Sequence, residues 1–533
     1  MSRSKTGCIT CRIRRVKCDE TKPECSKCRY SKRVCDGYLP EDNFMSRRQL
    51  ADKIKTLSVV GPVSRALSHS PSSSNPLSRP VSPNDTIYFD LFRRATVPST
   101  CNLFPSSFWQ ETVMQLAHIE PAIWHAAVAL GTLHQKAEEL AQGKDVDVLS
   151  HRAITHYGKA MALAKDLDSP TKIVTLSIAL VGAANMLERW SEMQTHVMAG
   201  LKIVARDGTY IQGLGVLGGS LMRVDVLAMT FSDSDSPYPY EESTSVFALD
   251  QFLQTPCIPP TSYENLSSEL FSIVRAFFLL DEGILSGSIS YGPWLTKLDA
   301  FTRRLIEWET NMARYEAVNE QPTPSENTVR LALRLYHVSI RVMLRATSFG
   351  PETRYDSILG YFEYAIRLAA TLQKRIQSHS SVNLTLEPGL MIPLWMTIHR
   401  CRHYQLRRAA LKILTDANMV EAMWRSDATA KILETVVALE EESLGPINAQ
   451  EYNPVFLDPS AFAIPWSAWS RPSLDLPTSV NWNDVPAIQE EKRVKEILGT
   501  TRLSERRVEL RLLMCPSNDV DPYGPVKELT VHF

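Results

Sequence analysis

The chain has 533 residues, of which 44% are hydrophobic, and its formal net charge is −1 at pH 7. That length allows a small module together with one large domain or two medium ones. No run of 18 apolar residues occurs, and the longest candidate, 174–187, is shorter and includes polar residues. The sequence therefore predicts no transmembrane span, and we expect no membrane partner.

The first 35 residues contain six cysteines with the spacing C-x2-C-x6-C-x6-C-x2-C-x6-C. They are Cys8, Cys11, Cys18, Cys25, Cys28 and Cys35. The second three repeat the first three at an offset of 17 residues, and soft thiolates of this kind select zinc. Three cysteines leave each ion one ligand short of four, and two bridging thiolates would supply the difference. We predict two Zn²⁺ ions, with Cys8 and Cys25, the first members of the two halves, as bridging candidates.

Other uses of these cysteines explain the pattern less well. A disulfide framework suits secreted proteins, whereas the opening residues 1–5 contain no apolar signal region. A redox C-x-x-C motif requires a βαβ context, and a RING-type site would include histidine at unequal spacings. Only five sizeable apolar residues lie in the segment: Ile9, Ile13, Val16, Tyr30 and Val34. Since so few can be buried, we expect the module to be folded with zinc and unfolded without it.

The residues between the cysteines carry a family resemblance. The basic run 12–17 lies between the second and third cysteines, Asp19 follows the third, and Pro23 precedes the fourth. In these features the segment resembles the fungal Zn2Cys6 binuclear cluster. The resemblance implies a two-zinc module, bridged by the first and fourth cysteines, that places a short helix in the DNA major groove. It also implies recognition of a CGG-type triplet, with base-reading positions among Arg14, Arg15 and Lys17.

Charge supports a nucleic-acid partner for this module. Residues 1–35 carry eleven Lys and Arg against three acidic residues, a formal +8, while residues 36–533 sum to −9. Six thiolates and two zinc ions would leave about +6, a charge typical of phosphate binding. Arg14 and Arg15 can offer paired donors to guanine, whereas the other basic residues could contact phosphate or remain solvated. The full candidate DNA-binding set is Arg12, Arg14, Arg15, Lys17, Lys22, Lys27, Lys32 and Arg33.

The zinc module is predicted to span 1–39, and a Ser/Pro-rich segment, 40–86, follows it. Leu50, Ile54 and Leu57 have helical spacing but cover barely two turns, which is shorter than a coiled coil for dimerisation requires. The serine- and proline-rich composition of 64–83 favours a flexible, disordered linker. Its Ser-Pro pairs at 70–71 and 82–83 are either phosphorylation sites or plain linker.

Helical periodicity dominates the next segment, 87–445. Apolar residues repeat at steps of three and four, as in Ile123, Ala127 and Leu130; Ile154, Tyr157, Met161 and Ala164; Ile173, Leu176, Leu180 and Leu187; Leu266, Leu270, Ile273, Phe277 and Leu280; Leu298, Phe301, Leu305, Trp308 and Met312; and Leu331, Leu335, Val338 and Val342. Pro121 marks a helix start, and glycines such as Gly389 mark stops. We predict at least ten helices and no strand before residue 500. The fold class is therefore mainly α: a small Zn2Cys6 module, a disordered linker and a large all-α regulatory domain.

This helical segment also resembles a known family. The residues 107–110, 120–126 and 129–131 are similar to the opening of the fungal-specific transcription factor domain, and 392–395 with 401–410 to its closing part. The resemblance implies a regulatory role, which is to hold a regulator inactive, sense a metabolite or bind co-regulators.

Catalytic motifs are absent from the helical segment, so we predict that the chain is not an enzyme. Its histidines, including His118, His125, His134, His151, His156 and His196, are scattered, as are Cys101, Cys257, Cys401 and Cys515. Packed or surface histidines and buried thiols explain them.

The C-terminal extension, 446–533, contains a Pro- and Trp-rich stretch, 461–469, and then a basic run, 492–511. Val508, Leu510 and Leu512 alternate with charged residues, which suits a strand or a helix docked on the helical domain.

Together these features predict a nuclear, zinc-dependent, sequence-specific DNA-binding transcription factor. It would act on RNA polymerase II genes of metabolic or biosynthetic pathways. Double-stranded DNA, a second copy or another zinc-cluster protein, and transcriptional co-regulators are the expected partners. The basic run 12–17 with Arg47 and Arg48 suggests nuclear import. The alternative is a zinc-stabilised co-regulator that acts through protein contacts of its helical domain, and an enzyme with a zinc-finger targeting arm ranks third.

Overall fold

The computed structural model forms two units, Met1–Ser78 and Arg79–Phe533. The residues that it describes are 18–21, 25–31, 83–206, 215–231, 233–246, 249–257, 259–319, 321–346, 350–376, 382–442, 444, 464–469, 471, 474–482, 486–502, 505–516 and 524–533. In the first unit they include one helix, α2 (Ser26–Tyr30). Residues 40–82 of the predicted linker 40–86, with the candidate dimer segment and the Ser-Pro site at 70–71, lie outside the described residues, whereas residues 83–86 form the start of a helix.

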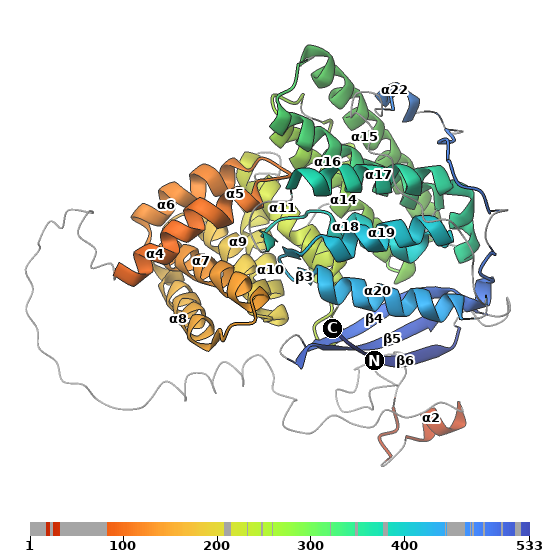
Figure 1. Ribbon diagram of the computed structural model, residues 1–533, viewed down its shortest axis with the longest axis horizontal. Helices are drawn as coiled ribbons and strands as arrows, with labels where there is room; N and C mark the ends of the chain where they lie inside the picture. Colours follow the sequence, from red (N-terminus) through yellow and green to blue (C-terminus); the bar gives the residue numbers. More distant parts are fainter. Residues whose placement is uncertain are drawn as a thin grey trace, which may run out of the picture. The chain divides into compact units, whose positions relative to one another are not determined.

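The second unit is mainly helical (Figure 1). Its first half contains α4 (Pro83–Leu91), η2 (Phe92–Thr96), α5 (Val97–Thr100), η3 (Phe108–Thr112), α6 (Val113–Ile119), α7 (Pro121–Ala141), α8 (Asp147–Leu163), η4 (Ala164–Asp166), α9 (Pro170–Met186), α10 (Trp190–Arg206), α11 (Gly215–Thr230), α12 (Tyr240–Val246) and α13 (Leu249–Gln254). The second half contains α14 (Tyr263–Leu285), α15 (Tyr291–Val318), α16 (Pro324–Ala346), η6 (Glu352–Ile358), α17 (Leu359–Ile376), α18 (Met391–Arg400), α19 (Tyr404–Asp416), α20 (Ser426–Glu441), α22 (Trp466–Trp469) and η8 (Glu490–Lys492). No helix among the described residues is long and apolar enough to cross a membrane.

Local sequence signals set several helix starts. Pro121 begins α7, as predicted, because proline lacks the amide hydrogen that a first-turn residue leaves unpaired. Thr323 and Glu326 form a capping box at α16: the Thr323 amide donates to the Glu326 carboxylate (2.8 Å), and the Glu326 amide donates to the Thr323 hydroxyl (3.3 Å). These caps satisfy amide groups that the helix itself cannot pair.

The helices pack in sequence around a continuous core. Helix α9 is central to the first half and is buried on every side from Val174 to Asn185. Further along, α16 packs on α17, α17 on α19, and α19 on α20, which in turn covers the tail strands (Figure 1). The predicted apolar repeats of α14 and α16 are buried, and those of α15 are buried apart from the half-buried Leu298.

Helix α8 shows where the periodicity was misread. The predicted face included Ile154 and Met161, yet both side chains are exposed. The buried face instead runs through Ala153, Tyr157 and Ala160, which face the neighbouring helices. Apolar residues stand on both sides of this helix, so spacing alone did not identify the packed side.

Helix α7 packs closely against the chain from α4 to η2 at Gly131. A Cβ atom at this position would lie 2.0 Å from the backbone oxygen of Tyr88 and 3.0 Å from the amide nitrogen of Phe92. We expect Gly131→Ala to destabilise the fold by about 1–3 kcal/mol, because backbone atoms cannot move aside as a side chain can. Gly158→Ala on α8, where no atom lies within 4 Å, is the matched control and should be neutral or stabilising by up to about 1 kcal/mol. Chemical denaturation of both variants measures the difference, and equal stabilities would contradict the packing argument.

A small sheet interrupts the helices, so the prediction that no strand precedes residue 500 was wrong. Its order is β1 (Asn383–Thr385), β2 (Met419–Glu421) and β3 (Trp424–Arg425), with β1 parallel to β2 and β2 antiparallel to β3. Strands of two or three residues are too short to show an alternating pattern.

Glu421, at the end of β2, is buried and caps helix α18. Its carboxylate accepts hydrogen bonds from the amides of Gly389 (3.0 Å), Leu390 and Met391 (3.0 Å). Burial raises the pKa of Glu421 to about 7, although these amides act in the opposite direction. Burial of Glu421 therefore costs the least free energy when its carboxyl group is protonated.

This raised pKa predicts a pH dependence of stability. The unfolded carboxyl titrates near 4.5, so the folded state holds the proton more tightly between that pH and about 7. The stabilisation is complete below pH 4.5 and is lost as the pH rises to about 7, with a change of about 3 kcal/mol. Denaturant unfolding of the wild type and of Glu421→Gln at several pH values tests this. The stability difference between the two proteins should change over this interval, and a constant difference would contradict the assignment.

The tail forms a second sheet, with the strand order β4 (Val494–Arg502), β5 (Arg507–Met514) and β6 (Val526–His532), all antiparallel. The alternation predicted from Val508, Leu510 and Leu512 is that of β5, whose buried side packs against Val436 of α20. Strand β4 begins at Val494, before the predicted limit of residue 500. The Trp-rich stretch contributes α22, whose Trp466 ring meets Trp308 of α15 edge to face at 5.4 Å.

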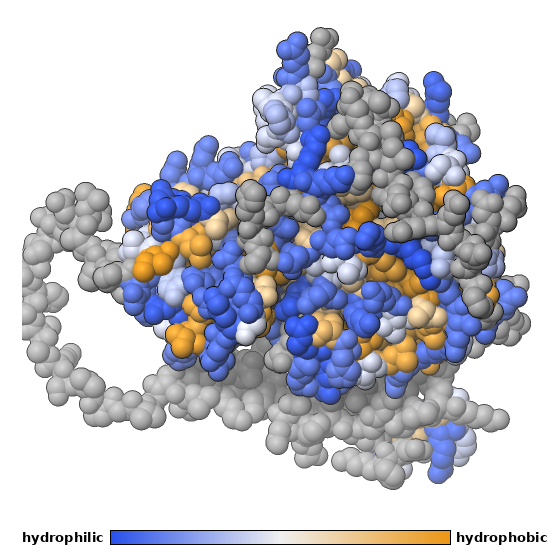
Figure 2. All heavy atoms as spheres, in the orientation of Figure 1, coloured by the Kyte–Doolittle hydropathy of each residue, from blue (hydrophilic) through white to orange (hydrophobic). Residues whose placement is uncertain are grey.

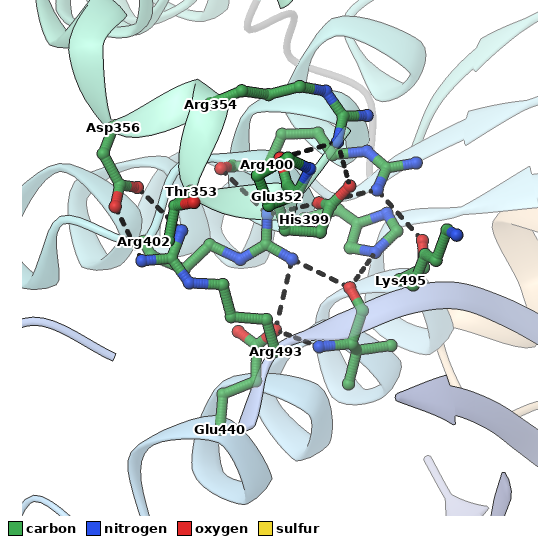
Figure 3. A network of polar contacts seen from close by, with 12 residues as sticks. Glu352, Thr353, Arg354, Asp356, His399, Arg400, Arg402, Glu440, Arg493 and Lys495 are labelled. Carbon is green, nitrogen blue, oxygen red and sulfur yellow. Dashed lines mark hydrogen bonds and ion pairs between the residues drawn. The ribbon is translucent and has the colours of Figure 1, made fainter. Parts of the chain in front are cut away.

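A buried network of charges joins the helices to the first residue of β4 (Figure 3). Glu440 of α20 accepts hydrogen bonds from Arg402 (3.3 Å), Arg407 and the Val494 amide (2.6 Å). Arg402 also donates to Glu352 (2.9 Å) and to the Val494 carbonyl (2.8 Å). Burial acts to raise the pKa of Glu440, but the charges of Arg407 and Arg402 outweigh it and hold the pKa below its usual value. The network therefore contains ionised groups that depend on one another.

A second pair lies beside this network. Arg493 is buried and binds the Asp356 carboxylate with two hydrogen bonds (2.8 and 2.6 Å).

The outer surface differs from the interior: the face seen in Figure 2 is mostly hydrophilic, interrupted by small groups of hydrophobic residues. Polar contacts join the tail to the helical part both in the interior, as in the pair of Arg493 and Asp356, and at the surface, where Arg502 pairs with Asp235 (2.8 Å).

Candidate metal centre

Three of the six predicted zinc ligands lie in the described part of the first unit. Cys18, Cys25 and Cys28 are all buried, whereas Cys8, Cys11 and Cys35 lie outside the described residues. The ligand atoms of Cys18, Asp19 and Cys25 lie within 4.8 Å of one another, a separation that one ion could bridge. Among the described residues this is the one group of three or more potential metal ligands.

Backbone amides face two of the sulfur atoms. The Cys28 amide donates to Cys25 Sγ (3.3 Å), and the Glu20 amide donates to Cys18 Sγ (3.4 Å). The first contact exists because Cys25 is the N-cap of α2, so its sulfur lies over the first turn of the helix. Amide donors favour the thiolate form, and thiolates are the ligands that zinc prefers. The buried sulfurs and their donors therefore fit zinc.

Asp19 has a structural role that the sequence analysis missed. Its carboxylate accepts from the Thr21 hydroxyl and from the amides of Ser26 (3.1 Å) and Lys27 (3.4 Å). The hydrogen bond from Thr21, followed by that from Ser26, holds the pKa of Asp19 well below its usual range. Because these bonds already use its oxygens, Asp19 joins the loop after Cys18 to the start of α2. The acid stands seven residues before the helix, too far away for a capping pattern to reveal it.

The predicted DNA-binding residues are mostly beyond the described part of the chain. Lys27 lies on α2 with an exposed side chain, and Arg29 is exposed on the same helix. The others, Arg12, Arg14, Arg15, Lys17, Lys22, Lys32 and Arg33, lie outside the described residues and stay predictions. Tyr30, which the sequence analysis counted among the apolar groups available for burial, is 82% exposed. This correction strengthens the expectation that metal binding, more than burial, stabilises the module.

The scattered histidines and cysteines of the second unit are packed or surface residues: His118 and His151 are exposed, whereas His134 and His156 are buried. His134 is buried beside Thr96 (3.0 Å), and burial lowers its pKa. Burial is also the main cause that raises the pKa values of Cys401 and Cys515 to about 12. Cys257 is buried too, whereas Cys101 is only half-buried. Thiols of such high pKa carry little thiolate and are weak nucleophiles.

Comparisons with protein families identify both regions. The model of the fungal specific transcription factor domain matches residues 87–415, and that of the fungal Zn(2)-Cys(6) binuclear cluster domain matches residues 6–42. The first match covers more than half of the chain.

Curated relatives carry the names of transcription regulators. The aspercryptin biosynthesis cluster-specific transcription regulator atnN of Emericella nidulans is 26% identical over 220 residues, 38% of this chain and 35% of that protein. The transcription regulator lscL of Purpureocillium lilacinum is 27% identical over 215 residues, 37% of this chain and 48% of that protein. Transcription factor lfc1 of Flammulina velutipes is 59% identical over 54 residues, 10% of this chain and 19% of that protein. The chain thus spans less than half the length of each of these relatives. No solved structure matches it significantly.

Proposed function

The chain belongs to the fungal specific transcription factor domain family, and we propose that it recognises specific DNA sequences through its zinc module. It is a fungal transcription regulator, a class that is not an enzyme family, and its Zn2Cys6 domain binds two zinc ions. Beyond this class, we propose which residues hold the zinc ions, which DNA sequence is recognised, which genes are regulated and which partners take part.

The match to the binuclear cluster over 6–42 carries the proposal, since it spans all six cysteines. In the proposed site, Cys8, Cys11, Cys18, Cys25, Cys28 and Cys35 hold two zinc ions, and Cys8 and Cys25 bridge them. The buried sulfurs of Cys18, Cys25 and Cys28 support this ligand set. Zinc supplies the folding free energy of the module, so the ions hold the basic residues in place for DNA.

Recognition divides between base and phosphate contacts. Arg14, Arg15 and Lys17 read a CGG-like triplet in the major groove, whereas Arg12, Lys22, Lys27, Lys32 and Arg33 contact phosphates. The exposed side chain of Lys27 supports the second role for that residue. One triplet is too short to specify a promoter, so a second copy or another zinc-cluster protein supplies a second triplet. We further propose a nuclear location and, because one relative is named as specific to a biosynthesis cluster, biosynthetic genes as targets.

The test is selection of bound sequences from a random DNA pool by zinc-loaded full-length protein, with and without chelator. CGG-like triplets should be enriched only with zinc, and paired triplets at a fixed spacing would indicate a dimer. Arg14→Ala with Arg15→Ala should relax the preference for guanine, by about 1–3 kcal/mol for each lost contact. Lys27→Ala is the comparison, because loss of one phosphate contact weakens all sequences equally and lowers the salt dependence. No enrichment by zinc-loaded protein would instead favour a co-regulator that acts through protein contacts.

A further inference from the structure

A cavity of about 530 Å³ lies between the helices and the tail sheet. Its walls come from the end of α11, the loop before α12, the start of α12, α14, α18, β3, α20, β4 and β5. Cavities of this size are typical of small-molecule sites. A molecule bound here would contact the helical body and the tail at once.

Aromatic rings form much of the wall. Trp424 lies 5.2 Å from Trp395 and meets Phe231 edge to face at 5.6 Å, as measured between ring centroids. Tyr238 and Tyr240 form a second pair at 4.8 Å. Both tyrosine hydroxyls are already used, since Tyr238 donates to Asp225 (2.7 Å) and Tyr240 to the Met229 carbonyl (3.3 Å). This wall therefore offers ring surfaces and few unsatisfied hydroxyl groups.

The charged lining residues leave one acid without a partner. Arg400 is paired with Glu352 (2.9 Å), and Arg425 is paired with Asp427 (2.7 Å). Glu496 lies 3.7 Å from Arg400. The Glu282 carboxylate, in contrast, has no hydrogen bond or ion pair within the part of the chain that the structure describes. The basic residues of the wall are thus engaged elsewhere, and Glu282 is available to a cation.

Glu282 also lies near the aromatic wall. Glu282 and Tyr240 both line the cavity, and the charge of Glu282 is, after burial, the next cause that raises the pKa of Tyr240. Burial and the neighbouring Asp281 raise the pKa of Glu282 itself, because nearby negative charge disfavours its ionised form. An ammonium group placed here would neutralise the carboxylate, and aromatic faces attract cations as well.

We propose that this cavity is an effector site for a small ring-bearing amine, a proposal that rests on the regulatory function proposed above. The ring packs against the aromatic wall, and the ammonium group pairs with Glu282. Since the wall includes β4 and β5, the bound amine also strengthens the attachment of the tail sheet to the helices.

Three molecules with one ring and different charges test the proposal: tryptamine (cation), tryptophol (neutral) and indole-3-acetate (anion). Isothermal titration with zinc-loaded full-length protein should show binding of tryptamine, at least tenfold weaker binding of tryptophol and still weaker binding of the anion. Tryptamine should also raise the melting temperature. Glu282→Gln should remove the preference for tryptamine over tryptophol, whereas Glu434→Gln, on the exposed side of α20, should leave it unchanged.

The proposal is overturned if tryptamine does not bind, if all three molecules bind equally, or if Glu282→Gln keeps the preference. Thermal unfolding of Glu282→Gln verifies that the variant is folded, which we expect because its side chain has no partner to lose among the described residues. DNA binding by the same samples is measured separately. Binding of tryptamine without sequence-specific DNA binding would count against the proposed function alone, and the reverse result would count against the effector site alone.

Discussion

Cys25→Ala is expected to remove both zinc ions and to abolish sequence-specific DNA binding. Cys25 is buried at the N-cap of α2, and we propose that it bridges the two ions. Structural zinc contributes roughly 10–16 kcal/mol per site in small finger domains, more than a module with so few apolar residues can replace. Loss of a ligand common to both ions therefore unfolds the whole module. Zinc content by mass spectrometry and binding to a selected DNA site measure the two effects.

Cys101→Ser is the matched control for that variant. Cys101 is half-buried in the second unit, its Sγ lies 3.8 Å from the Ser106 carbonyl, and a hydroxyl can form the same contact. We expect this protein to keep two zinc ions and full affinity for DNA. If Cys25→Ala kept both ions and bound DNA like the control, Cys25 would not be a bridging ligand.

The metal module could be predicted from sequence because its ligands are close together in the chain. The repeated cysteine spacing predicts the ligands and the metal, and the family match supports a domain that binds two zinc ions. The role of Asp19 could not be predicted, since its partners Ser26 and Lys27 follow at seven and eight residues, outside any known capping pattern. The exposure of Tyr30 could not be predicted either, because an aromatic side chain between cysteines can point toward the interior or toward solvent.

The helical unit shows the same division between local and distant contacts. The steps of three and four that include Leu270 and Leu335 predicted buried faces correctly, because a long helix repeats its pattern over several turns. The strands near Val420 were missed, since they are only two or three residues long and β2 pairs with the distant strand β1, so no local alternation marks them. The cavity is lined by residues from α11 through β5, which are far apart in the sequence, so no local pattern predicts it.

The buried charges were the least predictable feature, and they lead to the second large effect. Glu440→Ala is expected to destabilise the second unit by about 3–5 kcal/mol. The substitution leaves Arg402 and Arg407, both buried, without this carboxylate, and the Val494 amide loses its acceptor. Removal of one partner costs more than the pair contributes, because the remaining charges stay out of water. Denaturant unfolding measures the loss, and hydrogen exchange at the start of β4 should show that the tail opens first.

Glu434→Ala on the same helix separates this effect from a general effect of charge. Glu434 pairs with Lys431 at 3.4 Å, and both side chains are about half exposed. Exposed pairs of this kind contribute little, so we expect a change below about 0.5 kcal/mol. If the two variants were equally stable, the network of Figure 3 would not hold the tail to the helices. The effector site would then also lose its physical basis, because its wall requires β4 and β5 to be attached.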